Sequence, residues 1–177
     1  MRQTYLILLL VFILYGCGDV EKEEKKYEII SGVSKLPEIV SYDLEGKREI
    51  ITHQPGEILV LNVWNIHCGP CIIEMPGLNK LVEKYRENDR VRFIALTNYS
   101  TDREKLKDFL QEHRFDFKQR LIKKKYKRQL DIEVVPTTIV CNGEGIISYY
   151  IQGGGLTTYK YIDRIINTLL SGETLTF

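Results

Sequence analysis

The chain has 177 residues, of which 44% are hydrophobic and 28% charged, and this composition is ordinary for a globular protein. The length is enough for one domain with a real hydrophobic core and short additional segments. A formal net charge of +1 excludes a strong electrostatic attraction to nucleic acid or to acidic partners, so we expect no nucleic-acid partner.

The first residues have the pattern of an export signal. Arg2 precedes an apolar stretch over residues 5–15, which is shorter than the roughly 20 residues of a membrane-spanning helix. Its length is typical of the apolar part of a signal peptide. The sequence Leu14-Tyr15-Gly16-Cys17 that follows resembles a bacterial lipobox, in which the cysteine is lipidated and becomes the mature N-terminus.

We therefore expect a lipoprotein signal peptide over residues 1–16 and a lipidated tether over residues 17–34, with Cys17 as the lipidated residue. The alternative is an ordinary cleaved signal or a single anchor helix, with Cys17 incidental. In either case the domain lies in the bacterial cell envelope, on the periplasmic or extracytoplasmic face. Disulfide chemistry is thermodynamically open in that compartment.

Residues 35–177 are predicted to form one α/β domain that begins with a β-hairpin. Residues 39–42 and 48–51 flank a turn that contains Gly46. Residues 58–64 are nearly all apolar, as in a central strand that is covered on both faces. Residues 72–85 then place apolar side chains at helical spacing.

A second buried strand is predicted over residues 91–97. Thr101 and Glu104 have the spacing of a capping box, so a helix is expected to start at this point and to carry His113 near its end. Residues 115–117 predict a short extra strand, and the basic stretch 120–128 predicts a helix with a solvated positive face.

The second half of the domain is predicted to be a hairpin and a helix. Residues 134–141 and 146–151 are strands on either side of the turn signal Asn142-Gly143. A last helix ends at Gly172. The first half is therefore a parallel β-α-β unit, and the second half is antiparallel.

The sequence Cys68-Gly69-Pro70-Cys71 lies between the predicted central strand and the helix that follows it. A thiol at a helix start is exposed to the positive end of the helix dipole and to unpaired N–H groups. Both favour the thiolate, so the cysteine pKa is expected to fall from about 8.5 toward 7 or below. Two thiols at this spacing can cycle between dithiol and disulfide, and redox exchange is the leading hypothesis. A zinc site is the alternative, but it needs two further ligands that the remaining His and Cys residues do not offer at a suitable spacing.

Two stretches carry a resemblance to a known family. Residues 60–76, which contain the CGPC motif and Met75-Pro76, and residues 134–138, which contain Val135-Pro136-Thr137, together resemble the thioredoxin fold and its TlpA/ResA-like branch of membrane-tethered thiol-disulfide oxidoreductases. The resemblance covers roughly residues 35–171. It implies a thioredoxin-like fold, in which a central mixed sheet has helices on both faces and an N-terminal β-hairpin is added.

Three positions depart from the common pattern. His67 stands before the first cysteine, where most thioredoxins have Trp, and Asn62 stands six residues before it, where thioredoxin has a buried Asp. The branch resembled usually has a Glu three residues after the second cysteine, and Glu74 matches it. Cys141 lies outside the family pattern and is expected to be a small buried residue.

The resemblance implies a catalytic role for three residues. Cys68 is expected to attack a substrate disulfide, and the more buried Cys71 to resolve the mixed disulfide. Glu74 is expected on the buried side of the helix with a raised pKa, where it accepts the proton of Cys71. An exposed Glu74 that only supports the helix is the alternative.

The same resemblance implies four residues at the substrate-binding surface. Pro136 is expected to be a cis-proline that faces the two cysteines and leaves the backbone of Val135 open to an extended substrate. His67 either stabilises the Cys68 thiolate or is an exposed residue with little effect. Trp64 belongs to this group by position, although we expect it to pack beneath the motif. No cofactor and no metal are implied.

The function implied is reduction of disulfides in extracytoplasmic proteins, in the manner of cytochrome c maturation factors. The expected partners are protein substrates with disulfides, an upstream thiol electron donor in the membrane, and the membrane itself through the lipid; we expect a monomer. The alternatives are a disulfide oxidant or isomerase and a non-catalytic lipoprotein that uses the fold for binding. A thiol peroxidase is disfavoured because Leu61 and Asn65 stand where peroxiredoxins have Pro and Thr or Ser.

Overall fold

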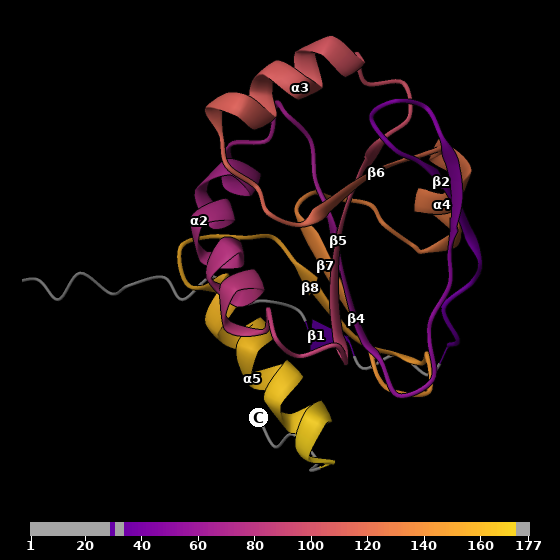
Figure 1. Ribbon diagram of the computed structural model, residues 1–177, viewed down its shortest axis with the longest axis vertical. Helices are drawn as coiled ribbons and strands as arrows, with labels where there is room; N and C mark the ends of the chain where they lie inside the picture. The colour runs from indigo at the N-terminus through magenta and orange to yellow at the C-terminus, as the bar shows by residue number, and fades with distance from the viewer. Residues whose placement is uncertain (1–28, 31–33, 173–177) are drawn as a thin grey trace, which may run out of the picture.

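The computed structural model describes residues 29–30 and 34–172, and its centre is one eight-stranded mixed sheet (Figure 1). The strands are β1 (Ile29–Ile30), β2 (Ile39–Tyr42), β3 (Arg48–Ile51), β4 (Ile58–Val63), β5 (Val91–Asn98), β6 (Lys118–Ile122), β7 (Thr137–Cys141) and β8 (Ile147–Gln152). The helices are α2 (Gly69–Lys84), α3 (Arg103–Glu112), α4 (Lys124–Gln129) and α5 (Thr158–Ser171).

The strand order is β1-β8-β7-β4-β5-β6-β2-β3. Strands β4, β5 and β6 are parallel, and the other neighbouring pairs are antiparallel. All six residues of β4 are buried, which confirms the central strand predicted from its apolar run. We call the end of the sheet at which β4, β5 and β6 finish its carboxyl end, and the opposite end its amino end.

Helices cover both faces of the sheet. Helices α2, α3 and α5 bury one face, and Leu78, Leu106 and Ile166 are in the same apolar cluster as Val60. Helix α4 covers the other face, where Tyr126 packs in a second cluster with Leu61. In Figure 1, α2 and α5 lie on one side of the sheet and α4 on the other. The thioredoxin-like fold class is therefore confirmed, and the hairpin β2–β3 extends the sheet because β2 pairs with β6.

Several predicted boundaries are wrong. Residues 115–117 form no strand, and the extra strand is β6, which takes in Arg120 to Ile122 from the stretch predicted as a helix. Only residues 124–128 of that stretch are helical, as part of α4. The cap of α3 is Asp102 rather than Thr101, since the Asp102 carboxylate accepts hydrogen bonds from the N–H groups of Glu104 and Lys105.

Strand β1 lies in the segment expected as a tether and was not predicted. It pairs antiparallel with β8, with Ile29 opposite Ile151 and Ile30 opposite Tyr150. Further along the chain, the carbonyl of Ser34 accepts a hydrogen bond from the N–H of Ile147. The chain entering the domain therefore belongs to the sheet before the hairpin starts.

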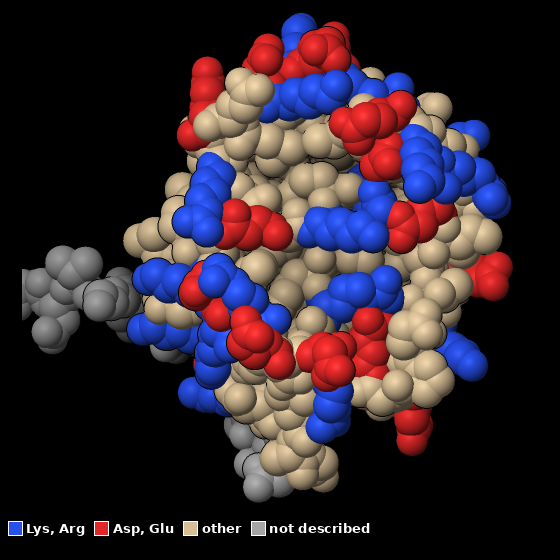
Figure 2. Space-filling view, in the orientation of Figure 1, with Lys and Arg blue, Asp and Glu red and all other residues tan. Residues whose placement is uncertain are grey.

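The surface carries charges of both signs. On the face drawn in Figure 2, Lys and Arg alternate with Asp and Glu, so this face presents no broad field of one sign. Within residues 29–30 and 34–172, no helix has the length and apolar content needed to cross a membrane.

Candidate active site

The two cysteines of the CGPC motif occupy the start of α2. Cys68 is the N-cap, directly after the loop that follows β4, and the backbone N–H of Cys71 lies 3.2 Å from the Cys68 sulfur. The two sulfurs are joined in a disulfide. Cys68 is partly buried, whereas Cys71 has only 1% of its surface exposed. Of the two sulfurs, that of Cys68 is thus the more open to a partner, as expected for the attacking residue.

An aromatic cluster supports the motif from beneath. Trp64 is fully buried, and its ring centroid lies 5.5 Å from those of both Phe109 and Phe115. Trp64 belongs to the same apolar cluster as Cys68 and Cys71, in agreement with the expectation that it packs under the motif. Its place among the substrate-binding residues is corrected, because a side chain with no exposed surface cannot contact a docked protein.

The loop before β7 meets the motif at the carboxyl end of the sheet. The Val135–Pro136 bond is cis, as expected. Thr137, the first residue of β7, pairs with Val63, the last residue of β4, so both loops leave the sheet at the same end. Val135 and Cys68 pack against the same apolar cluster.

Glu74 lies on the buried side of α2, with 1% of its surface exposed. The Nδ2 group of Asn62 donates to Glu74 Oε1 at 2.8 Å and lies 3.0 Å from Thr138 Oγ1. Burial raises the pKa of Glu74 to about 8, and the hydrogen bond from Asn62 offsets part of that rise. The predicted burial and raised pKa are therefore confirmed.

Two residues at this carboxyl group escaped the sequence analysis. Asn62 stands out in the sequence only as a departure from the thioredoxin pattern, and Gly154 is the middle residue of the run Gly153-Gly154-Gly155 that follows β8. A Cβ atom on Gly154 would lie 2.2 Å from Glu74 Oε2 and 2.6 Å from Pro136 Cγ. Gly154 thus lets the chain pass directly against the carboxyl group and the cis-proline. The sequence signal for it was the triple glycine itself, which shows where a chain turns but not what it touches.

The remaining candidate residues, which have no contact with the Glu74 carboxyl group among the interactions given above, are His67, Cys141 and Cys17. His67 is exposed and directly precedes Cys68. Cys141 is fully buried on β7, as expected, and burial together with the charge of Glu57 raises its pKa to about 12. Cys17 lies outside the described residues. Within the described part of the chain, no three His, Cys, Asp or Glu residues are grouped so as to hold a metal ion.

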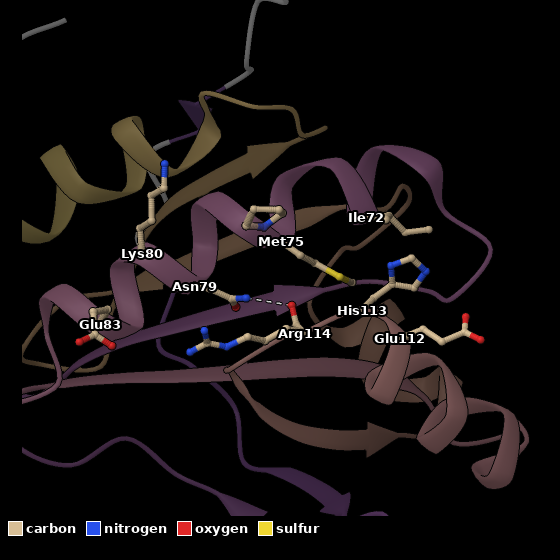
Figure 3. A pocket seen from close by; sticks show the side chains of 9 residues that line it. Ile72, Met75, Asn79, Lys80, Glu83, Glu112, His113 and Arg114 are labelled. Atoms are coloured by element: carbon tan, nitrogen blue, oxygen red, sulfur yellow. Dashed lines mark hydrogen bonds between the residues drawn. The ribbon is translucent and has the colours of Figure 1, made fainter.

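A groove of about 640 Å³ runs along the side of α2 (Figure 3). Ile72 and His113 lie at the end nearer the start of the helix, and Lys80 and Glu83 lie toward the other end. Across the groove, the Asn79 amide donates to the carbonyl of Arg114 at 2.8 Å and ties α2 to the loop after α3. The groove thus begins one residue from Cys71.

The fold, the disulfide at a helix start and the adjacent cis-proline define a thiol-disulfide oxidoreductase of the thioredoxin class. Residues 56–147 match the family model described as thioredoxin-like. A thiol-disulfide oxidoreductase ResA of Bacillus cereus is 33% identical over 143 residues, which cover 80% of this chain and 79% of that protein. The ResA protein of Bacillus thuringiensis subsp. konkukian is 29% identical over 86% of this chain and 91% of its own length.

Solved structures agree on the fold. A thiol:disulfide interchange protein of the thioredoxin family from Chlorobium tepidum TLS superposes with a TM-score of 0.66, over 80% of this chain and 99% of that one, at 17% identity. At that identity the likeness shows the fold alone.

The family model over residues 56–147 and the relative of 33% identity show the family: the chain belongs to the thioredoxin-like family of thiol-disulfide oxidoreductases.

Proposed function

We propose that the protein is an extracytoplasmic, membrane-tethered oxidoreductase that reduces disulfides in other proteins. The observation that carries this proposal is the unequal burial of the two sulfurs, at a helix start beside a cis-proline loop. In this proposal the Cys68 sulfur meets the substrate and the Cys71 sulfur displaces it. Nothing about this geometry requires a cofactor.

The first step is attack by the Cys68 thiolate on a substrate disulfide. The dipole of α2 and the N–H of Cys71 stabilise negative charge on the Cys68 sulfur. The new bond joins Cys68 to one substrate sulfur, and the second substrate sulfur leaves as a thiolate. A mixed disulfide results, with no net change in electron count.

The second step is resolution by Cys71. A buried thiol must lose its proton before it attacks, and Glu74 is the nearby buried base. The proton passes from the Cys71 thiol to the Glu74 carboxylate, the Cys71 thiolate attacks Cys68, and the bound substrate sulfur leaves reduced. The substrate has then gained the two electrons that the Cys68–Cys71 pair has lost. A pKa of about 8 lies near neutral pH, so a fraction of Glu74 is ionised there, and this carboxylate is a stronger base than an exposed one.

A protein substrate would dock on the apolar surface around the site. Three of the exposed large hydrophobic residues, Ile73, Val134 and Leu156, lie one or two residues along the chain from Glu74, Pro136 and Gly154, respectively. The backbone of Val135 would pair with an extended substrate segment, in the way that edge pairing recognises peptides. His67, exposed next to Cys68, would border the docked chain.

The Gly69-Pro70 dipeptide favours the reducing direction, because thioredoxin shares it and has a potential of about −270 mV; the dipeptide is one of several contributors to the potential. A reductant must itself be reduced, so a membrane-embedded thiol donor is part of the proposal. Lipidation of Cys17 would hold the mature chain at the membrane. The proposed protein is a monomer, and reduction of cytochrome c precursors is one task that fits it. A disulfide oxidant is the second candidate.

The decisive experiment uses two cysteine variants and one potential. Cys71→Ser should accumulate a mixed disulfide through Cys68 with a disulfide-bonded substrate such as insulin, and Cys68→Ser should accumulate none and lose activity. Full turnover in either variant would refute the mechanism. A Cys68–Cys71 potential near or below about −250 mV supports the reductant, and one near −120 mV supports the oxidant.

A further inference from the structure

The direction of the N-terminal segment in the sheet decides from which side the chain reaches the domain. Ile29 pairs with Ile151, one residue before the end of β8, at the carboxyl end of the sheet. Lys35 bridges Ile146, and the N–H of Leu36 donates to the carbonyl of Gly145, at the amino end. Ile29 and Ile30 therefore lie toward the carboxyl end and Lys35 and Leu36 toward the amino end, so the chain enters β1 at the carboxyl end of the sheet.

The carboxyl end of β8 is also where the redox site lies. Gly153 follows β8 directly, and its N–H donates to the carbonyl of Pro136 at 2.8 Å. Gly154 lies against Glu74 and Pro136. The point at which the tether enters is therefore one strand, β8, away from the cis-proline loop.

We propose that this polarity turns the redox end of the domain toward the membrane, so that the Cys68–Cys71 pair faces the membrane-held thiol donor of the proposed function. The proposal rests on the proposed function for the anchor at Cys17. Residues 18–28, between Cys17 and β1, can span at most about 40 Å when fully extended. A tether of this length, attached beside the site, favours encounters of the site with membrane-held partners over encounters with distant ones.

The opposite attachment point provides a matched control. Helix α5 runs alongside α2 in the same direction, since Tyr159 packs at Gly77 and Asp163 binds Lys84 further along. Both helices start at the carboxyl end of the sheet and proceed toward its amino end. An anchor attached after residue 177 would therefore turn the domain the other way.

The orientation test uses the mature chain, residues 17–177, with Cys17→Ser and a histidine tag at either terminus on nickel-chelating vesicles. Exposed sites on either side of β5, Ser100 at the carboxyl end and Asp89 at the amino end, are each replaced by Cys and labelled with a fluorophore in the oxidised protein. With the N-terminal tag, a lipid-borne acceptor should quench the label at position 100 more than that at position 89, and the C-terminal tag should reverse the order. The same order with both tags, or stronger quenching at position 89 with the N-terminal tag, overturns the proposal.

The partner test adds a phospholipid that carries a dithiol headgroup to the vesicles. The lipid dithiol is oxidised to its own disulfide, and the Cys68–Cys71 disulfide takes up two electrons and two protons. We expect reduction to be about tenfold faster with the N-terminal tag than with the C-terminal tag, and equal rates for both with soluble dithiothreitol. Equal rates with the lipid dithiol overturn the proposal. Neither assay uses substrate turnover or natural lipidation. The quenching order and the ratio of reduction rates can therefore be interpreted even if the protein proves not to be a lipidated disulfide reductase.

Discussion

Glu74 lies in an environment unlike that of an ordinary glutamate. Its carboxyl group is buried, has one amide donor and packs against Gly154, and its second oxygen, Oε2, has no hydrogen-bond partner. An unpaired buried carboxylate oxygen is costly to ionise, which is the physical reason for its raised pKa. A group of this kind links protonation to the stability of the fold.

Stability should therefore fall with rising pH because of Glu74. Its pKa is raised from 4.5 to about 8, so the unfolded chain loses this proton near pH 4.5 while the folded chain keeps it. The stabilisation is complete below the unfolded value and is lost toward pH 8, at up to about 1.4 kcal/mol per pH unit. Glu74→Gln removes this titration, so the variant should gain stability relative to wild type between pH 5 and pH 8.

Urea unfolding of oxidised wild type and oxidised Glu74→Gln at pH 5 and at pH 8 measures this change in the free energy of unfolding. Glu83→Gln, at an exposed carboxylate of the same helix, is the matched control. An offset between wild type and Glu74→Gln that stays constant with pH would contradict the role of burial at this site.

At the scale of elements, the site is a meeting of a helix, a strand end and two loops. The loop at Gly154 is held between α2 and the cis-proline loop, and the hydrogen bond from Gly153 to Pro136 ties the two loops together. A glycine is thus required at position 154 because its own loop, α2 and the cis-proline loop lie too close together there for a side chain, and not because the chain turns.

Gly154→Ala should separate these elements. The added methyl group would lie 2.2 Å from Glu74 Oε2, so the carboxyl group or the loop must move. We expect a loss of about 1–3 kcal/mol of stability, as for other overpacked sites, and slower resolution of the mixed disulfide. Gly143→Ala, where the nearest atom is 3.4 Å away, is the control. Unfolding midpoints and single-turnover rates that match wild type would show that the loop has room to adjust.

The elements also show how far the sequence alone leads. Strand β4 and helix α2 were predictable because their apolar patterns are long and local, and the CGPC motif between them located the redox pair. Strand β6 was not, because Lys118 and Arg120 give it the composition of a solvated helix. It is a strand because β5 and β2 pair with it on both sides, and Glu49 of β3 pairs with both basic residues. The contacts of Asn62 and Gly154 depend in the same way on residues distant in the chain.

At the scale of the whole molecule, the sheet includes the chain that leads into it. Two backbone hydrogen bonds, from Leu36 to Gly145 and from Ile147 to Ser34, fasten this segment to the hairpin β7–β8, and β1 pairs with β8 beyond them. Its removal would leave the edge of β8 unpaired and exposed.

A chain that begins at residue 38 should therefore be less stable than one that begins at residue 29. At about 1 kcal/mol per lost backbone hydrogen bond, we expect a decrease of about 1–3 kcal/mol in the free energy of unfolding. Thermal or urea unfolding of the two oxidised chains measures it. Equal stabilities would mean that the leading segment adds nothing to the sheet.

The position of Cys141 has a consequence for the way in which the protein reaches its native state. Cys141 lies opposite Leu59, so its sulfur is withdrawn from solvent only when β7 has been added to β4. Before that event, the thiols of Cys68, Cys71 and Cys141 are all open to oxidants and can combine in the wrong pairs. In the extracytoplasmic compartment of the proposed function, correct pairing of Cys68 with Cys71 thus depends on β7 joining β4 before Cys141 is oxidised.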